Sequence, residues 1–211
     1  DRTSFNVAMR RSWLDVLSVP AFAVLRTIRK KSSDPYYELM DAGYSMTDFN
    51  AKVTHKIAED NVLRFGFIAG KDALKFEHRE IRSVVGEDYK FRWGNVVGYA
   101  DWQNIIADDV HYDLKVYYTQ HRSRMNWDRI NEMATSQQYE LRESWLTGIY
   151  DIGLRLDFDQ QLDDVHRLRY GAEHIFHMYR PEQSWSTADL SSGLMSASYF
   201  GTETAFYAED E

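Results

Sequence analysis

The chain has 211 residues, of which 44% are hydrophobic, and its 33 acidic against 25 basic residues give a formal net charge of -8. It contains no cysteine, which excludes a disulfide scaffold, a thiol nucleophile and a cysteine-ligated metal. An acidic balance without a basic stripe argues against a nucleic-acid partner. No run of about 18 uncharged apolar residues is present, so a transmembrane helix is excluded.

Apolar and polar residues alternate with period two along much of the chain, which predicts β-strands. The alternation is clearest in residues 150–160, where Ile152, Leu154 and Leu156 share one face. In chain order the predicted strands cover residues 5–13, 49–57, 63–69, 93–105, 112–122, 150–160, 168–176 and 195–207. The expected fold is therefore all-β, with about eight antiparallel strands.

The predicted connections alternate between short and long. The short ones are residues 58–61, 106–111 and 161–166, and the long ones are residues 14–46, 72–90, 124–148 and 180–194. Outer-membrane barrels have short turns at the periplasmic rim and long loops at the exterior rim. The pattern therefore indicates an antiparallel transmembrane β-barrel with four exterior loops.

A soluble sandwich or a lipocalin-like barrel is the alternative, because its apolar face would point inward. The positions of aromatic residues favour the membrane. Trp102 and Tyr112 flank a short turn, whereas Tyr150, Phe176 and Tyr179 are expected near the opposite ends of their strands. Two aromatic bands around an aliphatic middle are typical of membrane interfaces.

The hairpin around residues 161–165 allows a prediction of register. If the turn centres on Asp163, Asp157 faces Arg169 and Asp159 faces Arg167. Opposite charges then meet on one face while apolar residues meet on the other. We interpret these pairs as structural, in a solvated lumen or at its rim.

No catalytic or metal site emerges from the motifs. His174 and His177 imitate a short metal motif, but residues three apart on a strand point to opposite faces. The chain has no nucleophile elbow and no phosphate-binding glycine loop. We expect neither enzyme activity nor a cofactor.

Ligand-binding candidates lie in the predicted long loops. Trp127 and Tyr139 in the third loop and Trp185 in the fourth could stack on a ligand such as a sugar, or could pack within the loops. Arg29 belongs to a basic patch in the first loop that could meet lipopolysaccharide phosphates or an anionic ligand, or could be a solvated surface.

Several blocks of sequence resemble strand-turn-strand segments of TonB-dependent outer-membrane receptors. They include Trp93-Gly94-Asn95, followed by Trp102 and by residues 114–118. Residues 48–53 with 66–72, and residues 148–158 with 169–173, resemble further segments of that family. The blocks occur along the chain in the same order as in the family. The pattern is most similar to the branch with an N-terminal carboxypeptidase-regulatory-like domain, related to glycan importers that work under a surface lipoprotein lid.

The resemblance implies a barrel of twenty-two strands around a plug, in the outer membrane of a Gram-negative bacterium, that imports a glycan, siderophore or peptide with energy from TonB. Residues 1–211 are then expected to form part of the barrel domain, without the plug and the TonB box. Expected partners are outer-membrane lipid, lipopolysaccharide, a ligand, TonB through absent parts of the chain and a lipoprotein lid. The alternative is a self-contained eight-stranded barrel, acting as a membrane anchor or adhesin, or a soluble ligand-binding protein.

Overall fold

Most of the chain is described by a computed structural model. The described residues are 2–14, 16–17, 20–21, 23–24, 27, 38–80, 85–107, 110–132, 138–187 and 192–211. Within these residues, no helix combines the length and the apolar character needed to cross a membrane.

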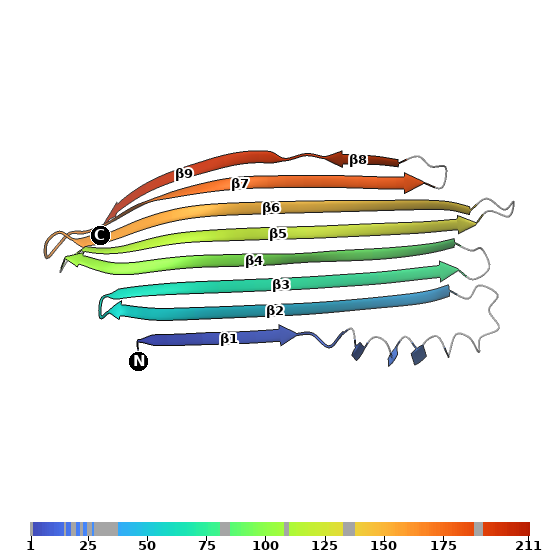
Figure 1. Ribbon diagram of the computed structural model, residues 1–211, viewed down its shortest axis with the longest axis horizontal. Coiled ribbons are helices and arrows are strands. Elements are labelled where there is room, and N and C mark those ends of the chain that lie inside the picture. Colours follow the sequence, from blue (N-terminus) through green and yellow to red (C-terminus); the bar gives the residue numbers. More distant parts are fainter. Residues whose placement is uncertain are drawn as a thin grey trace.

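Nine described strands form one antiparallel sheet (Figure 1). They are β1 (Thr3–Arg11), β2 (Glu38–Ala58), β3 (Asn61–Glu80), β4 (Val85–Ala107), β5 (Val110–Glu132), β6 (Gln138–Gln161), β7 (Arg167–Thr187), β8 (Ser192–Ser196) and β9 (Tyr199–Asp210). Neighbours in sequence are neighbours in the sheet, except that β8 and β9 both pair with β7. The predicted last strand is thus two strands in one sheet position, and the sheet is not closed.

Three of the four long connections expected between strands are largely strand, and much of the first, residues 14–46, lies outside the described residues. Strands β2 to β7 are 20 to 24 residues long, about twice what a bilayer requires. Most of residues 72–90, 124–148 and 180–194 therefore continue the sheet, and the prediction of long loops there was wrong. Every strand except β8 has one end toward the short turns, at the left of Figure 1.

The apolar side chains change face partway along each long strand, which explains that error. In β5, Val116 and Tyr118 lie on one face, and Arg122 and Arg124 follow them on that same face. Trp127 lies on the opposite face. A search for continuous alternation therefore ends at the exchange, although the backbone pairing continues.

We call the face that carries Val116 the outer face and the opposite one the inner face. The strand pairing places apolar residues on the outer face of β1 to β7 and of β9. This apolar band consists of Phe5, Val7, Met9, Phe49, Ala51, Val53, Leu63, Phe65, Phe67, Ala69, Val96, Gly98, Ala100, Trp102, Tyr112, Leu114, Val116, Tyr118, Tyr150, Ile152, Leu154, Leu156, Phe158, Leu168, Tyr170, Ala172, Phe176, Met178, Phe200 and Phe206.

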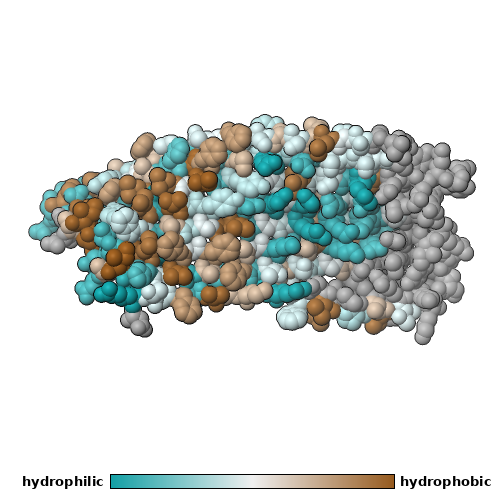
Figure 2. Space-filling view, viewed as in Figure 1, coloured by the Kyte–Doolittle hydropathy of each residue, from teal (hydrophilic) through white to brown (hydrophobic). Residues whose placement is uncertain are grey.

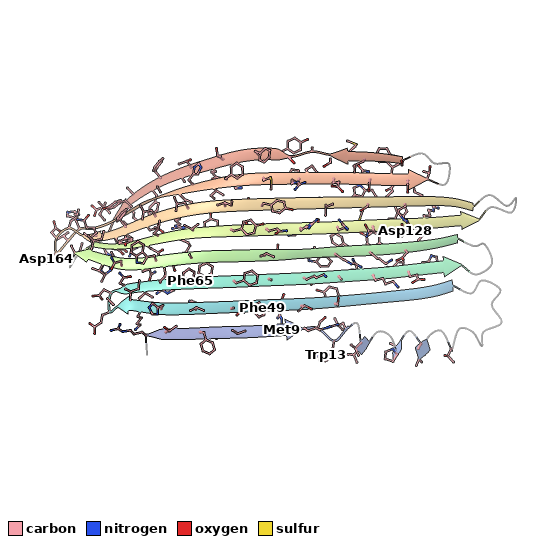
Figure 3. The ribbon with its side chains drawn as sticks, in the orientation of Figure 1. Met9, Trp13, Phe49, Phe65, Asp128 and Asp164 are labelled. Carbon is pink, nitrogen blue, oxygen red and sulfur yellow. The ribbon has the colours of Figure 1, made fainter. Side chains whose placement is uncertain are left out.

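The apolar band occupies only the half of the sheet toward the short turns. On the face shown in Figure 2, hydrophobic side chains gather on that half and hydrophilic ones on the other. In Figure 3, Phe65 lies toward the short turns and Asp128 toward the far ends. From Tyr150 to Phe158 the band runs about 27 Å along β6 at ~3.4 Å per residue, a length suited to a tilted membrane strand.

The sheet has no apolar core of its own. No hydrophobic residue among those described is buried, and Ile152 and Leu154 are 55% and 49% exposed. The accessible surface is 14677 Å², whereas a compact protein of this length would expose about 10,000 Å². Among the described residues, no second layer therefore covers the apolar band.

The β6–β7 hairpin has a register two residues away from the predicted one. Asp157 lies opposite Gly171, and Asp159 lies opposite Arg169. The reason is the turn: the Leu162 N–H donates to the His166 carbonyl at 3.0 Å, which centres the loop one residue later than assumed. A shift of two residues keeps every side chain on its predicted face.

Close packing on the inner face leads to a first prediction. An added Cβ at Gly153 would overlap the ring of Tyr117, whose hydroxyl donates to Glu173 at 2.8 Å. We expect Gly153→Ala to displace Tyr117 and lower the free energy of unfolding by about 1 to 3 kcal/mol, measured by urea unfolding of the intact protein. Gly98→Ala is the control, because no atom lies within 4 Å of its added Cβ. Equal stability of the two variants would refute this packing argument.

Candidate functional site

Above the apolar band, the inner face carries a row of aromatic residues. Tyr89 of β4 lies opposite Trp127 of β5, Trp127 opposite Glu143 of β6, and Glu143 opposite Trp185 of β7. Neighbouring strands are about 4.8 Å apart, so Trp127 and Trp185 flank Glu143 on both sides. Trp185 is 37% exposed. Two of the predicted stacking residues are thus brought onto one row, with a carboxylate between them.

Further aromatic side chains lie directly below this row on the same face. The ring centroids of Phe91 and Trp93 are 4.7 Å apart, and those of Tyr44 and Trp93 are 6.3 Å apart. Trp145 shares a row with Phe91 through the register of β4, β5 and β6. We call the whole set the aromatic wall: Tyr44, Tyr89, Phe91, Trp93, Trp127, Trp145 and Trp185.

Polar groups are fixed at defined places in the aromatic wall. The Tyr44 hydroxyl donates to Asp72 at 2.5 Å, and this hydrogen bond raises the pKa of Tyr44 above its ordinary value. Arg129 pairs with Glu87 at 3.6 Å near the far ends of β4 and β5. Flat rings with a few oriented polar groups suit a ligand that has both planar apolar faces and hydrogen-bonding edges, such as a sugar.

At the level of the apolar band, the inner face is polar and its groups bind one another. Asp151 accepts a hydrogen bond from Thr119 at 2.9 Å and lies 2.7 Å from Nδ1 of His177. Asp157 receives hydrogen bonds from Arg155 at 2.7 Å and from Tyr207 at 2.6 Å. These contacts satisfy the carboxylates of Asp151 and Asp157, whereas Asp101 and Asp113 on the same face each keep one buried oxygen without a hydrogen-bond partner.

The four charged residues predicted to pair at the hairpin are differently connected. Arg167 holds Asp159 through two hydrogen bonds of 2.7 and 2.8 Å. Arg169 also approaches Asp159, at 3.5 Å, and lies 3.2 Å from Glu211. The predicted pairing of Arg169 with Asp157 was wrong, because the register places Gly171 opposite Asp157.

The other two ligand candidates are only partly placed. Tyr139 lies in β6 rather than in a loop, with its backbone paired to Asn131, and its side chain is outside the described residues. Arg29 is also outside them. Of the predicted set, only Trp127 and Trp185 therefore have a described place in the candidate site.

A metal site is not found among the described side chains, where no group of three or more ligand-type residues gathers. His174 lies on the outer face, 2.7 Å from the Thr204 hydroxyl, and His177 lies on the inner face beside Asp151. The two imidazoles therefore cannot share an ion.

The sequence analysis did not identify Tyr44, Tyr89, Phe91, Trp93 and Trp145. A signal for them exists in β4, where Tyr89, Phe91 and Trp93 occupy alternate positions with Lys90 and Arg92 between them. These aromatic residues lie on the inner face, whereas the apolar band lies on the outer face of the same strands. The signal would have been found by extending each strand and allowing the apolar side to change face.

These features define an all-β, antiparallel, barrel-type fold with an apolar outer band and a polar and aromatic inner wall. No family model matches the chain, and no curated protein matches it. Among solved structures, the ferric yersiniabactin uptake receptor of Yersinia pestis is similar in fold, with a TM-score of 0.59 at 13% identity. The match covers 98% of this chain and 32% of that receptor, so the chain spans about a third of that receptor's length.

Proposed function

We propose that this chain forms part of the barrel wall of a TonB-dependent receptor, which imports a scarce or large ligand across the outer membrane of a Gram-negative bacterium. The observation that carries the proposal is that the apolar side chains of the long strands change from the outer to the inner face at one level of the sheet. Below that level the apolar side chains point outward, as contact with lipid requires. Above it the aromatic wall points inward, where an entering ligand would pass.

The likeness in fold to a siderophore uptake receptor supports this proposal. The resemblance of residues 48–53, 93–95 and 148–158 to the TonB-dependent family supports it independently. The apolar band also opposes a soluble ligand-binding barrel, because Ile152 and Leu154 are exposed rather than enclosed. A self-contained eight-stranded barrel would bring the two edges of the sheet together, and here β1 pairs only with β2.

Within this function, the aromatic wall favours a glycan as the ligand, because sugar rings present flat C–H faces to aromatic rings. A ferric siderophore or a peptide is the alternative. We extend the proposal to the glycan-importing branch of the family. The protein would then work under a lipoprotein lid, with lipopolysaccharide around the barrel.

Energy-coupled uptake by cells that carry the intact protein tests the proposal. Labelled oligosaccharides, ferric siderophores and peptides are offered in turn. We expect one class to bind at the surface in all cells but to enter only when TonB and the proton gradient are present. Uptake that continues without TonB would indicate a passive pore. Recovery of the protein in the soluble fraction would contradict a membrane location altogether.

A further inference from the structure

Five cationic side chains lie on the outer face immediately above the apolar band. All five are exposed. We call them the cationic belt: Lys71, Arg92, Arg122, Arg124 and Arg180. They belong to β3, β4, β5 and β7, four of five consecutive strands, and therefore extend across the sheet rather than along one strand.

Register fixes the spacing of the cationic belt. One row across the sheet reads Lys71, Gly94, Arg122, Gly148 and Arg180, so cations alternate with glycines. At about 4.8 Å per strand, successive cations in this row are about 10 Å apart. The glycines add no side chain between the cations, but the ring of Tyr150 lies over Gly148, 2.7 Å from where a Cβ would be.

The row above brings two cations together directly. Arg92 lies opposite Arg124 on the neighbouring strand, and like charges in such pairs destabilise a sheet. Among the described carboxylates, none forms an ion pair with a belt residue, and Glu182 is the single one that register brings onto these two rows. The cationic belt therefore holds positive charge that the sheet does not neutralise.

Cations farther from the apolar band are neutralised. Lys75 lies 3.1 Å from Glu77, Lys90 lies 2.7 Å from Asp88, and Arg142 lies 2.7 Å from Asp128. These residues share the outer face with the cationic belt. Among these eight described cations of the outer face, the five of the cationic belt are therefore the ones without a carboxylate partner.

A groove joins the two surfaces. It has a volume of about 610 Å³, and its lining combines belt residues Lys71, Arg92, Arg122 and Arg124 with Phe49, Ala69 and Val96 of the apolar band. A smaller groove beside it is lined by Arg122, Tyr150 and Arg180. A ligand seated here would contact guanidinium groups at one end and hydrocarbon side chains at the other.

We infer that the cationic belt binds the phosphate groups of a membrane lipid, whose acyl chains lie along the apolar band. Arginine forks match phosphate oxygens, and the neighbouring apolar side chains match hydrocarbon. This inference rests on the proposed function, because it requires the apolar band to face lipid. It assigns a specific surface to a lipid partner and places that partner in the leaflet on the side of the aromatic wall.

The test compares two triple variants of the intact protein in detergent. Arg92→Gln, Arg122→Gln and Arg124→Gln remove three belt charges, and Lys75→Gln, Lys90→Gln and Arg142→Gln remove three charges from the same face above the belt. Both are titrated with diphosphoryl lipid A, and binding is followed by native mass spectrometry. We expect the belt variant to bind at least about tenfold more weakly than the wild type, and the control variant to bind nearly as tightly.

Two further probes identify what is recognised. With lipid A from which the phosphates have been removed, we expect the two variants to bind equally well. Inorganic phosphate is expected not to compete, even at concentrations at which the lipid itself saturates the protein. Equal binding of diphosphoryl lipid A to both variants would overturn the inference, and so would full competition by inorganic phosphate.

Failure of this inference can be told apart from failure of the proposed function. If the belt variant still imports ligand with TonB and still holds lipid like the control, only the lipid site is refuted. If the wild type leaves the membrane without detergent, the proposed function fails first.

Discussion

Leu154→Arg is expected to prevent stable insertion of the barrel. Leu154 lies in the middle of the apolar band, between Val116 and His174 on the neighbouring strands, and 49% of its surface is exposed. A charge at the centre of a bilayer destabilises a membrane barrel by about 2 to 4 kcal/mol. The measurement is the free energy of unfolding in lipid vesicles, together with the amount of protein in the outer-membrane fraction.

Leu146→Arg is the matched control. Leu146 also lies on the outer face of β6, but it is opposite Arg124, above the apolar band. The same substitution there should cost only about 0 to 1 kcal/mol, because the charge meets water or lipid headgroups. Equal losses at Leu154 and Leu146 would mean that the apolar band does not lie in the hydrocarbon.

Joint replacement of Trp127 and Trp185 by alanine is expected to weaken ligand binding by about tenfold to a hundredfold. The two rings flank Glu143 in the aromatic wall, and each ring contact with a ligand contributes about 0.5 to 1.5 kcal/mol. The measurement is the dissociation constant of the ligand identified by uptake, determined on the intact protein.

Trp102→Ala separates this effect from a general loss of stability. Trp102 lies on the outer face near a short turn, where its ring packs edge-on against Tyr112 with centroids 5.4 Å apart. Its removal should lower stability and leave ligand affinity unchanged. If Trp102→Ala weakened binding as much as the loss of Trp127 and Trp185, the aromatic wall would not be the ligand surface.

The half of the sheet that carries the apolar band was predictable from sequence for a physical reason. One of its faces is apolar and the other polar, which gives strict alternation, as in β6, where Ile152 and Leu154 alternate with Asp151 and Arg155. The opposite half is polar on its outer face and aromatic on its inner face. There the apolar side changes face, so the pattern looks like a break and was interpreted as loops.

The site depends on the register between strands. The sequence did not determine which residue lies at the centre of the β6–β7 turn, and the prediction was off by one residue. Trp127 and Trp185 were identifiable as stacking candidates, but only the pairing of β5, β6 and β7 places them on either side of Glu143. At the hairpin, Asp163 accepts hydrogen bonds from the N–H groups of Val165 and His166, both at 2.8 Å. This local turn sets the centre of the loop and thereby the partners of Asp157 and Asp159.

The most direct test of the account is the environment of alternate residues in β6. The chain has no cysteine of its own, so Ile152→Cys, Leu154→Cys and Arg155→Cys can each carry one spin label in the membrane-embedded protein. We predict that the labels at 152 and 154 are accessible to oxygen dissolved in lipid, and that the label at 155 is accessible to a water-soluble nickel chelate. Labels at 152 and 154 that are shielded from both reagents would place the apolar band inside a protein core and contradict the account.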